Sequence, residues 1–183
     1  IPDPEIELFS AAAAMRSQQQ TIQADVPAAQ NIAKRYAGQM MGRFVTIFSS
    51  GILSPVGRRW KTQINELAKA WAQSETLPEA DHNTLTGVLE PQHLVPSIIA
   101  LFLCCPGDHP RNRLRSDLTR QIFMVEGLNT DVIQAQGTNR LSHQWTSLHL
   151  GDYISYYLAM AYGIDPTPVE AIKNLKREMM SAG

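Results

Sequence analysis

Cysteine is scarce in this sequence. Only two occur among the 183 residues, the neighbours Cys104 and Cys105. Adjacent cysteines do not form an ordinary unstrained disulfide with each other, and no Cys-x-x-Cys or Cys/His spacing of a zinc site is present. We therefore expect two reduced, buried thiols at the end of a strand. Because free thiols are typical of a reducing compartment, the expected location is the cytoplasm.

Net charge and long apolar runs are also lacking. The 16 basic and 17 acidic residues give a formal net charge of −1. The protein as a whole therefore has no positive electrostatic field that would attract nucleic acid or an anionic membrane. The longest apolar run, residues 94–105, contains Pro96 and is far shorter than the roughly 20 residues that span a bilayer. The N-terminus lacks the basic and apolar regions of a signal peptide. It also lacks an initiating Met, which predicts a cut end of a longer protein.

Several motifs of catalytic sites are absent. No Gly-x-Gly-x-x-Gly or Walker-type loop follows a predicted strand, and neither Gly-x-Ser-x-Gly nor His-Glu-x-x-His occurs. The five histidines lack short metal-ligand spacing. His143 and His149 lie six residues apart on one predicted helix, so they face different ways. These absences argue against nucleotide-binding, serine-hydrolase and zinc sites.

What is present is the composition of an ordinary globular domain, with 44% hydrophobic and 18% charged residues. Apolar spacing and capping residues predict helices over residues 5–23, 26–41, 54–74, 114–120, 140–162 and from 167 onward. The expected N-caps are Asp3, Asp25, Ser54 and Thr167, the last in a capping box with Glu170. β-Branched and aromatic runs predict strands over residues 44–48, 94–105, 122–125 and 130–135, with a polar loop over 76–91.

Strands that alternate with helices predict an α/β fold, with a mostly parallel sheet of four to five strands covered by helices on both faces. Ligands of such sheets bind beyond the carboxyl ends of the strands. The loops after Phe48, Cys105, Val125 and Ala135 are therefore the expected place for chemistry.

The helix over residues 54–74 carries a polar face with one carboxylate. Its apolar stripe is predicted to comprise Val56, Trp60, Ile64, Leu67 and Trp71. Glu66 lies about 120° from the centre of that stripe, on the side of Arg59, Thr62 and Lys69. Helix geometry alone favours a solvated Glu66 paired with Lys69 at i+3. His82, taken alone, is an ordinary exposed loop histidine.

Two further segments admit a structural and a functional interpretation. Arg111, Arg113 and Arg115 surround a predicted helix start, where solvated or ion-paired side chains are expected and phosphate binding is the alternative. Gly151 and Asp152 lie inside a predicted helix, where close packing against another backbone or the sheet is expected and a direct site role is the alternative.

Several segments, in order along most of the chain, resemble the bifunctional phosphoglucose/phosphomannose isomerases. They are Arg58-Arg59-Trp60-Lys61-Thr62-Gln63-Ile64-Asn65-Glu66-Leu67-Ala68-Lys69-Ala70, Leu77-Pro78-Glu79, His82-Asn83, Gly151-Asp152-Tyr153-Ile154 and Gly163-Ile164-Asp165-Pro166. Proteins of this family contain two sugar-isomerase (SIS) domains. The resemblance implies that residues 26–183 form the C-terminal SIS domain, a three-layer, flavodoxin-like fold. Residues 1–25 are then an N-terminal helical extension, and the N-terminal SIS domain of the family is absent.

The resemblance also implies a chemistry. The family interconverts glucose 6-phosphate, and mannose 6-phosphate, with fructose 6-phosphate through a cis-enediol. By resemblance, Glu66 is the base that moves the proton between C1 and C2, and His82 opens the sugar ring in the active site of the neighbouring subunit of a homodimer. The best match to the family's lysine is Lys176 of Leu175-Lys176. Helix geometry agrees, since Lys176 lies at the edge of the apolar stripe whereas Lys173 points further toward solvent, and a plain snorkelling side chain is the alternative. Arg59 and Asn83 are the expected substrate-binding residues, and no metal or organic cofactor is implied.

The chain departs from the family pattern in three ways. Thr84 follows His82-Asn83 where the family commonly has Glu, and Leu67 follows Glu66 where it often has Asn. The N-terminal half, which grips the sugar phosphate in the family, has no counterpart here. We therefore expect the isolated chain to have little or no isomerase activity. A non-catalytic SIS module that binds sugar phosphates and a pure dimerisation domain stay open as alternatives.

Overall fold

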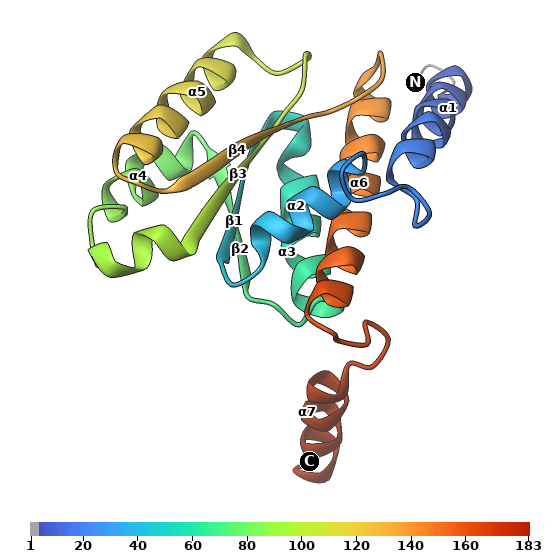
Figure 1. The fold of residues 1–183 in the computed structure, drawn as a ribbon, viewed down its shortest axis with the longest axis vertical. Helices are drawn as coiled ribbons and strands as arrows, with labels where there is room; N and C mark the ends of the chain where they lie inside the picture. The colour runs from blue at the N-terminus through green and yellow to red at the C-terminus, as the bar shows by residue number, and fades with distance from the viewer. Residues whose placement is uncertain (1–3) are drawn as a thin grey trace.

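The computed structural model describes residues 4–183, so the expected cap Asp3 lies outside the described residues. Its helices and strands follow one another as α1 (Glu5–Ile22), α2 (Ile32–Met40), β1 (Phe44–Ser50), α3 (Ser54–Leu67), β2 (Ala72–Leu77), α4 (Thr84–Gly87), β3 (Ile98–Cys104), α5 (Pro110–Val125), β4 (Asn129–Gln134), α6 (Arg140–Ala161) and α7 (Glu170–Ser181). Short 3-10 turns occupy Gly51–Leu53, Glu79–His82 and Gln92–Ser97. Helices and strands thus alternate through most of the chain (Figure 1).

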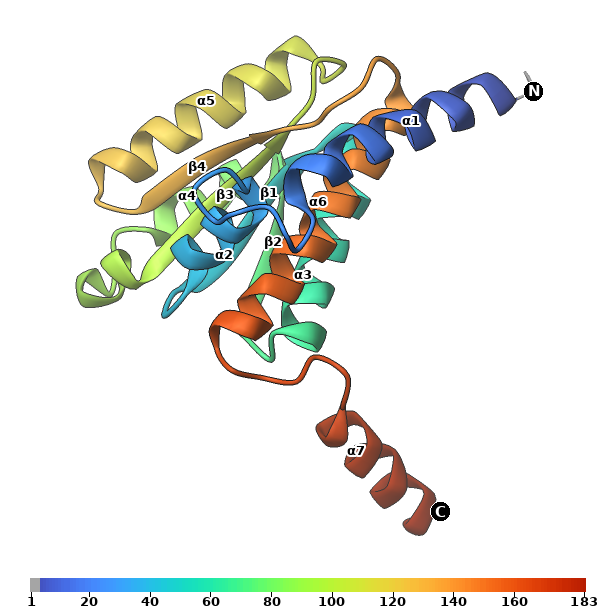
Figure 2. The ribbon, with the colours of Figure 1, turned by 45° about the vertical axis from the view of Figure 1, so that its right-hand side comes forward.

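The four strands form one parallel sheet in the order β2-β1-β3-β4. Helices α2, α3 and α6 cover one face, with α1 packed along α6, while α4 and α5 lie on the other face (Figures 1 and 2). The strands run in one direction and the helices return in the other, so every helix that follows a strand begins at the carboxyl edge. The predicted three-layer α/β fold is confirmed.

Two apolar clusters hold the layers together. The larger one lies between the sheet and the helices α2, α3 and α6, and includes Ile47, Leu101 and Trp60, each at most 1% exposed. The smaller one lies beneath α5, where Phe48 and Phe102 stack with ring centroids 4.8 Å apart and Phe123 meets Phe48 edge-on. The central strand β1 is buried from Val45 onward because it has helices on both sides.

Two predictions about strands were wrong, although the number of strands was within the predicted range. Residues 122–125 form the last turn of α5, whose side toward the sheet consists of Ser116, Thr119 and Phe123. Val125, which a buried strand would cover, is 84% exposed. The strand β2 occupies residues predicted as the end of a helix and the start of a polar loop. It is an edge strand with only its end residues Ala72 and Leu77 buried, so its polar middle carries no alternating apolar signal.

Several predicted helix ends were also displaced. The helix α2 begins at Ile32, because Asn31 rather than Asp25 supplies the cap by accepting from the Lys34 N–H at 3.1 Å. The helix α7 begins at Glu170 without a side-chain cap, and the Thr167 N–H donates to Asp165 instead.

The N-cap of α3 is Leu53 rather than Ser54, which is the first residue of the helix. The helix ends at Leu67, and Lys69 has the left-handed φ of 52°. Trp71 therefore lies beyond the helix and is 70% exposed, outside the apolar stripe in which it was predicted. The chain turns here and enters β2.

The C-terminal helix α7 extends away from the sheet and its covering helices (Figure 2). None of its residues is buried, although Ile172, Leu175 and Met179 form an apolar stripe along one side. Within residues 4–183, no helix has both the length and the apolar character needed to cross a bilayer. The free thiols of Cys104 and Cys105 lie at the end of β3, as predicted, but only Cys105 is buried and Cys104 is partly exposed.

Candidate functional site

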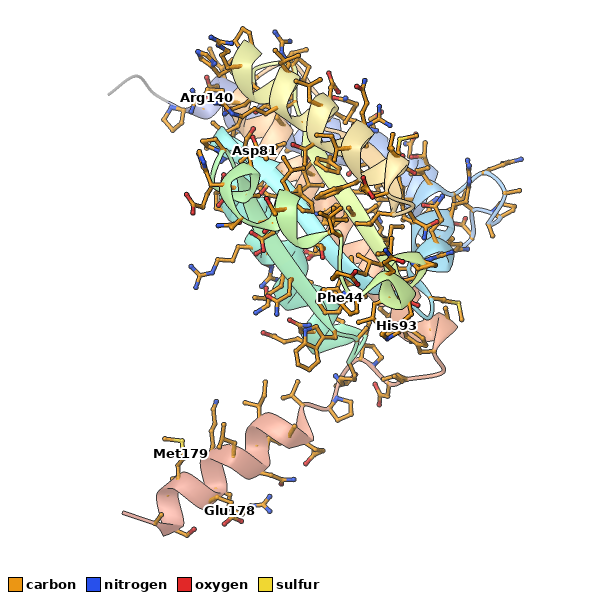
Figure 3. All side chains as sticks on the ribbon, turned by 90° about the vertical axis from the view of Figure 1, so that its left-hand side faces the viewer. Phe44, Asp81, His93, Arg140, Glu178 and Met179 are labelled. Atoms are coloured by element: carbon orange, nitrogen blue, oxygen red, sulfur yellow. The ribbon has the colours of Figure 1, made fainter. Side chains whose placement is uncertain are left out.

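Glu66 and His82 lie at opposite ends of the sheet. The helix α3 starts beside the carboxyl end of β1 and runs back along the sheet, so Glu66 in its last turn lies near the amino ends of the strands. The chain then passes through β2, whose six residues span about 20 Å, before it reaches His82. In Figure 3, Asp81 next to His82 lies at the end of the sheet that carries Arg140, whereas Phe44 marks the opposite end. A single chain therefore does not bring the two side chains together.

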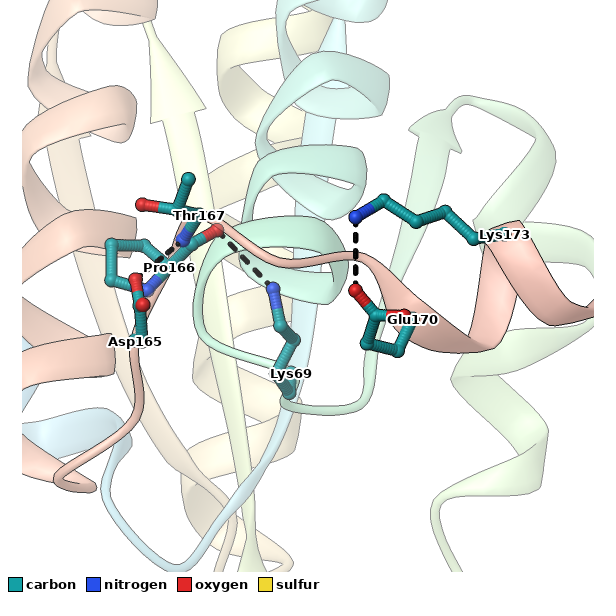
Figure 4. Close-up of polar contacts among 6 residues, drawn as sticks. All are labelled: Lys69, Asp165, Pro166, Thr167, Glu170 and Lys173. Carbon is teal, nitrogen blue, oxygen red and sulfur yellow. Dashed lines mark hydrogen bonds and ion pairs between the residues drawn. The ribbon is translucent and has the colours of Figure 1, made fainter.

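Glu66 is exposed, and its carboxylate has no ion-pair partner within the described part of the chain. The predicted i,i+3 pair with Lys69 is wrong, because the Lys69 ammonium donates to two backbone carbonyls, that of Glu66 and that of Pro166 (Figure 4). The left-handed backbone at Lys69 ends the helical spacing on which that prediction relied. The carboxylate is thus free to meet a ligand.

The helix that carries Glu66 is held firmly against α6. The Trp60 Nε1–H donates to the Ser147 carbonyl at 2.8 Å, and Gln63 Nε2 donates to Asp152 Oδ1 at 2.6 Å. Gly151 packs directly on the Trp60 indole, since a Cβ there would lie 2.2 Å from Nε1. The predicted close packing at Gly151 is confirmed, with a side chain rather than backbone or sheet as its partner. Glu66 therefore stands at the end of a rigid support.

Arg59 is exposed on the same face of α3 as Glu66, seven residues earlier. The rise of the helix puts about 10 Å between the two along its axis. Within residues 4–183, Arg59 forms no ion pair with an acidic side chain. This face of α3 thus presents one cation and one anion to solvent.

His82 ends the 3-10 turn Glu79–His82, and its side chain is exposed. The following Asn83 is already engaged within the loop. Its Nδ2 donates to Glu79 Oε1 at 3.1 Å, and its Oδ1 accepts from the N–H and hydroxyl of Thr84. Asn83 therefore caps α4 through its Oδ1. The Thr84 hydroxyl is already engaged in a hydrogen bond to the same oxygen. The amide predicted to bind substrate supports the His82 loop in this structure.

Lys176 lies on α7, which extends away from the sheet and the helices that cover it (Figure 2). It is exposed and forms neither a hydrogen bond nor an ion pair with residues of the described chain. Lys173 instead donates to Glu170 at 2.9 Å within the same helix (Figure 4). Of these two lysines, Lys176 is the one left available for an external partner.

The loops after β1 and β3 border a cleft of about 500 Å³ at the carboxyl edge, where the sequence predicted a ligand. Its walls include Gly51, Asp108, His109 and Arg140. Burial, followed by the charge of Asp108, raises the pKa of the neighbouring Cys105 thiol to about 11. None of Glu66, His82 and Lys176 lines this cleft. The cleft and the residues identified by resemblance are thus separate places on the molecule.

The remaining predicted candidates have structural contacts. Arg115 pairs with Asp81, as the ion-pair interpretation of the arginines predicted. His143 lies 3.2 Å from the Gly137 carbonyl, whereas the His149 ring contacts Gln18 and Gln19 of α1, so the two histidines do face different ways. Within residues 4–183, no three metal-ligating side chains gather in a group. The anchoring role of Asp81 was missed, because its partners on α5 are distant in sequence.

Comparison with known proteins identifies the family. Residues 29–179 match the bacterial phospho-glucose isomerase C-terminal SIS domain. A bifunctional phosphoglucose/phosphomannose isomerase of Caldicellulosiruptor bescii is 35% identical over 158 residues, which cover 85% of this chain and 46% of that protein. The corresponding protein of Aquifex aeolicus is 33% identical over 146 residues, 80% of this chain and 45% of its own length. The chain therefore spans about half the length of these relatives.

Solved structures agree on the fold. A glucose-6-phosphate isomerase like protein from Thermus thermophilus superposes with a TM-score of 0.77 at 25% identity, covering 88% of this chain and 54% of that one. The C-terminal domain of the glucosamine-fructose-6-phosphate aminotransferase from Francisella tularensis superposes with a TM-score of 0.67 at 15% identity, over 90% of this chain and 49% of that one. The family assignment follows from the match over residues 29–179, and the parallel sheet agrees with it. This chain belongs to the bacterial phosphoglucose isomerase C-terminal SIS domain family.

Proposed function

We propose that this chain is the C-terminal catalytic half of an aldose–ketose isomerase that interconverts glucose 6-phosphate, and mannose 6-phosphate, with fructose 6-phosphate. The observation that carries the proposal is the Glu66 carboxylate. It lies in the segment that resembles the family's catalytic motif, is exposed and unpaired among the described residues, and stands on a helix fixed to α6. A base that must approach two carbon atoms of a substrate requires both access and a rigid support.

In the proposed reaction, His82 first transfers a proton to the ring oxygen O5 as the bond between O5 and the anomeric carbon breaks, and it takes up the proton of the anomeric hydroxyl, which becomes the carbonyl oxygen. Glu66 then removes the proton from the carbon next to the carbonyl, which gives a cis-enediol. The same carboxylate returns that proton to the neighbouring carbon while the proton of the O2 hydroxyl passes to O1, so the carbonyl moves from C1 to C2 and aldose becomes ketose without net gain or loss of atoms. Lys176 stabilises the negative charge that develops on the enediol oxygens. Arg59 offers a cation to the substrate on the Glu66 side.

The distance between Glu66 and His82 supports a dimer. A proton-transfer group works within about 3 Å of the proton that it moves, and the length of β2 alone separates these residues by about 20 Å. We propose that His82 of one subunit completes the active site that contains Glu66 of the other. A two-fold axis would then form two equivalent sites.

A further part of the proposed enzyme is the N-terminal SIS domain of the family, which would grip the sugar phosphate. The proposed division of this chain is a helical extension, residues 1–25, followed by the SIS domain, residues 26–183. The unpartnered apolar stripe of α7 gives that helix a surface on which to dock and so to place Lys176. We propose that the enzyme acts in the cytoplasm, and that the 183-residue chain alone turns over little or no substrate.

The first test is formation of glucose 6-phosphate from fructose 6-phosphate by the full-length gene product and its Glu66→Gln variant. Positioned acid–base groups contribute about 10²–10⁴-fold, so the variant should lose activity by that factor while its circular dichroism stays unchanged. The matched control is Glu126→Gln, which changes an exposed glutamate at the end of α5 and should keep full activity. An inactive parent, or a Glu66→Gln variant as fast as the parent, would refute the proposal.

The shared site has its own test. Glu66→Gln and His82→Ala subunits, each inactive, are mixed and allowed to exchange. Half of the resulting dimers are then mixed, and each mixed dimer contains one site with both parental residues, so roughly a quarter of the parental activity should return. Recovery of no activity after proven exchange would show that His82 does not cross to the partner.

A sugar-phosphate-binding module without catalysis is the second candidate, and the cleft at the carboxyl edge favours it. Arg140 and His109 line this cleft, and it lies at the N-terminal ends of α3, α5 and α6, where anions are stabilised. Under this hypothesis, calorimetry detects fructose 6-phosphate binding that Arg140→Ala weakens, while no turnover is found. Turnover that depends on Glu66 would exclude it. A chain that neither turns over nor binds the sugar phosphate would leave the dimerisation domain as the function.

A further inference from the structure

The turn that carries His82 presents two of its residues to solvent and two to the protein. In a 3-10 helix, side chains three residues apart eclipse each other, so Glu79 and His82 share the outer side of the turn Glu79–His82. Both are exposed, whereas Ala80 is fully buried in the cluster beneath α5. Asp81 turns toward α5 as well. Two inward residues therefore fix a turn whose outer side displays the histidine.

Asp81 is bound through both of its carboxylate oxygens. Thr119 Oγ1 donates to Oδ1 at 2.8 Å, and Arg115 Nε lies 3.3 Å from Oδ2. The donors come from one face of α5, four residues apart, and Thr119 is only 3% exposed. The Asp81 side chain itself is 19% exposed, so these contacts are partly shielded from water. They join two segments that lie 38 residues apart in sequence.

From this geometry we propose that Asp81 is a positioning residue for His82: it anchors the catalytic turn to α5 so that the imidazole projects toward the partner's active site. This inference rests on the proposed isomerase function and adds a residue that the motif resemblance did not assign. The anchor matters because His82 itself is exposed and forms no hydrogen bond or ion pair within the described chain. Its direction is therefore set by the backbone of the turn.

The chemistry of the clamp requires a carboxylate. An ionised Asp accepts on both oxygens, which matches one hydroxyl donor and one guanidinium donor. An Asn of the same shape offers a single acceptor and turns an amide N–H₂ toward one of these donors. The Asp81→Asn variant consequently loses one anchoring contact with almost no change in volume. Thr119→Val removes the hydroxyl that donates to Asp81 and keeps the shape of the residue 119 side chain.

The test measures kcat and KM for fructose 6-phosphate with the full-length gene product, in the parental and the His82→Ala backgrounds. Misplacement of a catalytic group by about 1 Å can cost roughly 100-fold. We expect Asp81→Asn and Thr119→Val to lower kcat by about 10- to 100-fold with little change in KM. Because the anchor acts through His82, neither change should lower kcat further once His82 is Ala. Asp117→Asn, at an exposed position of α5, is the matched control and should have no effect in either background.

An equal loss in both backgrounds, or no loss in the parental one, would overturn the positioning role. Hydrogen exchange gives a readout that does not depend on activity. Asp81→Asn should speed exchange of the amides of residues 79–83, and Asp117→Asn should not. Unchanged exchange in Asp81→Asn would refute the anchor even in an inactive protein. If the parent has no isomerase activity, the proposed function fails, and the exchange result alone decides whether Asp81 holds the turn.

Discussion

Replacement of Gly151 by Ala tests the packing that holds α3, and with it Glu66, against α6. A Cβ at position 151 would lie 2.2 Å from Trp60 Nε1 and 2.5 Å from two further atoms of the indole. Real Cβ atoms do not approach other atoms so closely, so the indole must move. Trp60 is 1% exposed and cannot move outward without displacing its neighbours. Its hydrogen bond to the Ser147 carbonyl, 2.8 Å long, would be broken by the same shift.

The expected magnitude follows from these two contacts. Overpacking of a filled core costs about 1–3 kcal/mol, and a buried N–H left without an acceptor costs about 1–3 kcal/mol more. The free energy of unfolding should therefore fall by about 2–6 kcal/mol. For a domain of this size, each kcal/mol lowers Tm by about 2–4 °C, which predicts a shift of roughly 4–24 °C.

Differential scanning calorimetry and urea unfolding measure both quantities. The matched control is Gly38→Ala in α2, where an added Cβ meets no atom within 4 Å. The same chemical change should there stabilise the protein by about 0.5–1 kcal/mol, because Ala is the better helix former. A Gly151→Ala protein as stable as the parent would refute the packing argument, and so would equal destabilisation by the two variants.

Two other predictions concern stability. Asn31→Ala should lower the free energy of unfolding by about 1–3 kcal/mol in urea titrations, because Asn31 is fully buried, caps α2 and donates to the Gln23 carbonyl. A loss as small as that of an exposed residue would contradict this role. The second concerns pH. Burial raises the pKa of the Cys105 thiol from its ordinary value of 9.0 to about 11, so the unfolded chain releases this proton first. Stability should therefore fall as pH rises from 9.0 to about 11, by at most about 1.4 kcal/mol per pH unit from this group. The Cys105→Ala variant should show a shallower decline, and an identical pH profile in both proteins would contradict the assignment.

Patterns in the sequence predicted the fold wherever burial is one-sided or complete. The spacing of Val56, Trp60 and Ile64 predicted the face that α3 buries, and the apolar runs predicted β1 and β3. Sequence reasoning failed where tertiary contacts decide. The edge strand β2 is polar in its middle and has its backbone partner in β1. The helix α2 starts late because Asn31 finds a partner in the preceding turn, which local sequence does not reveal.

The candidate site was predicted less completely than the fold. Periodicity placed Glu66 on a polar face of α3, but its assignment as a base came from resemblance to a family. The ion pair expected with Lys69 did not form, because the helix ends between the two residues. The separation of Glu66 from His82 depends on the direction in which α3 and β2 run, which follows from strand pairing. The spacing of the two residues, 16 positions apart along the chain, does not reveal this separation.

The placement of Glu66 and His82 at opposite ends of β2 has a genetic consequence. In the proposed dimer, each active site takes one residue from each polypeptide, so two alleles expressed in the same cell contribute to every mixed site. A subunit that lacks only Glu66 inactivates one site of its dimer with a normal subunit and leaves the other site intact. A subunit that lacks both Glu66 and His82 inactivates both sites, including the site that contains Glu66 of the normal subunit. The double-lesion allele should therefore be dominant-negative, whereas the two single-lesion alleles should complement each other.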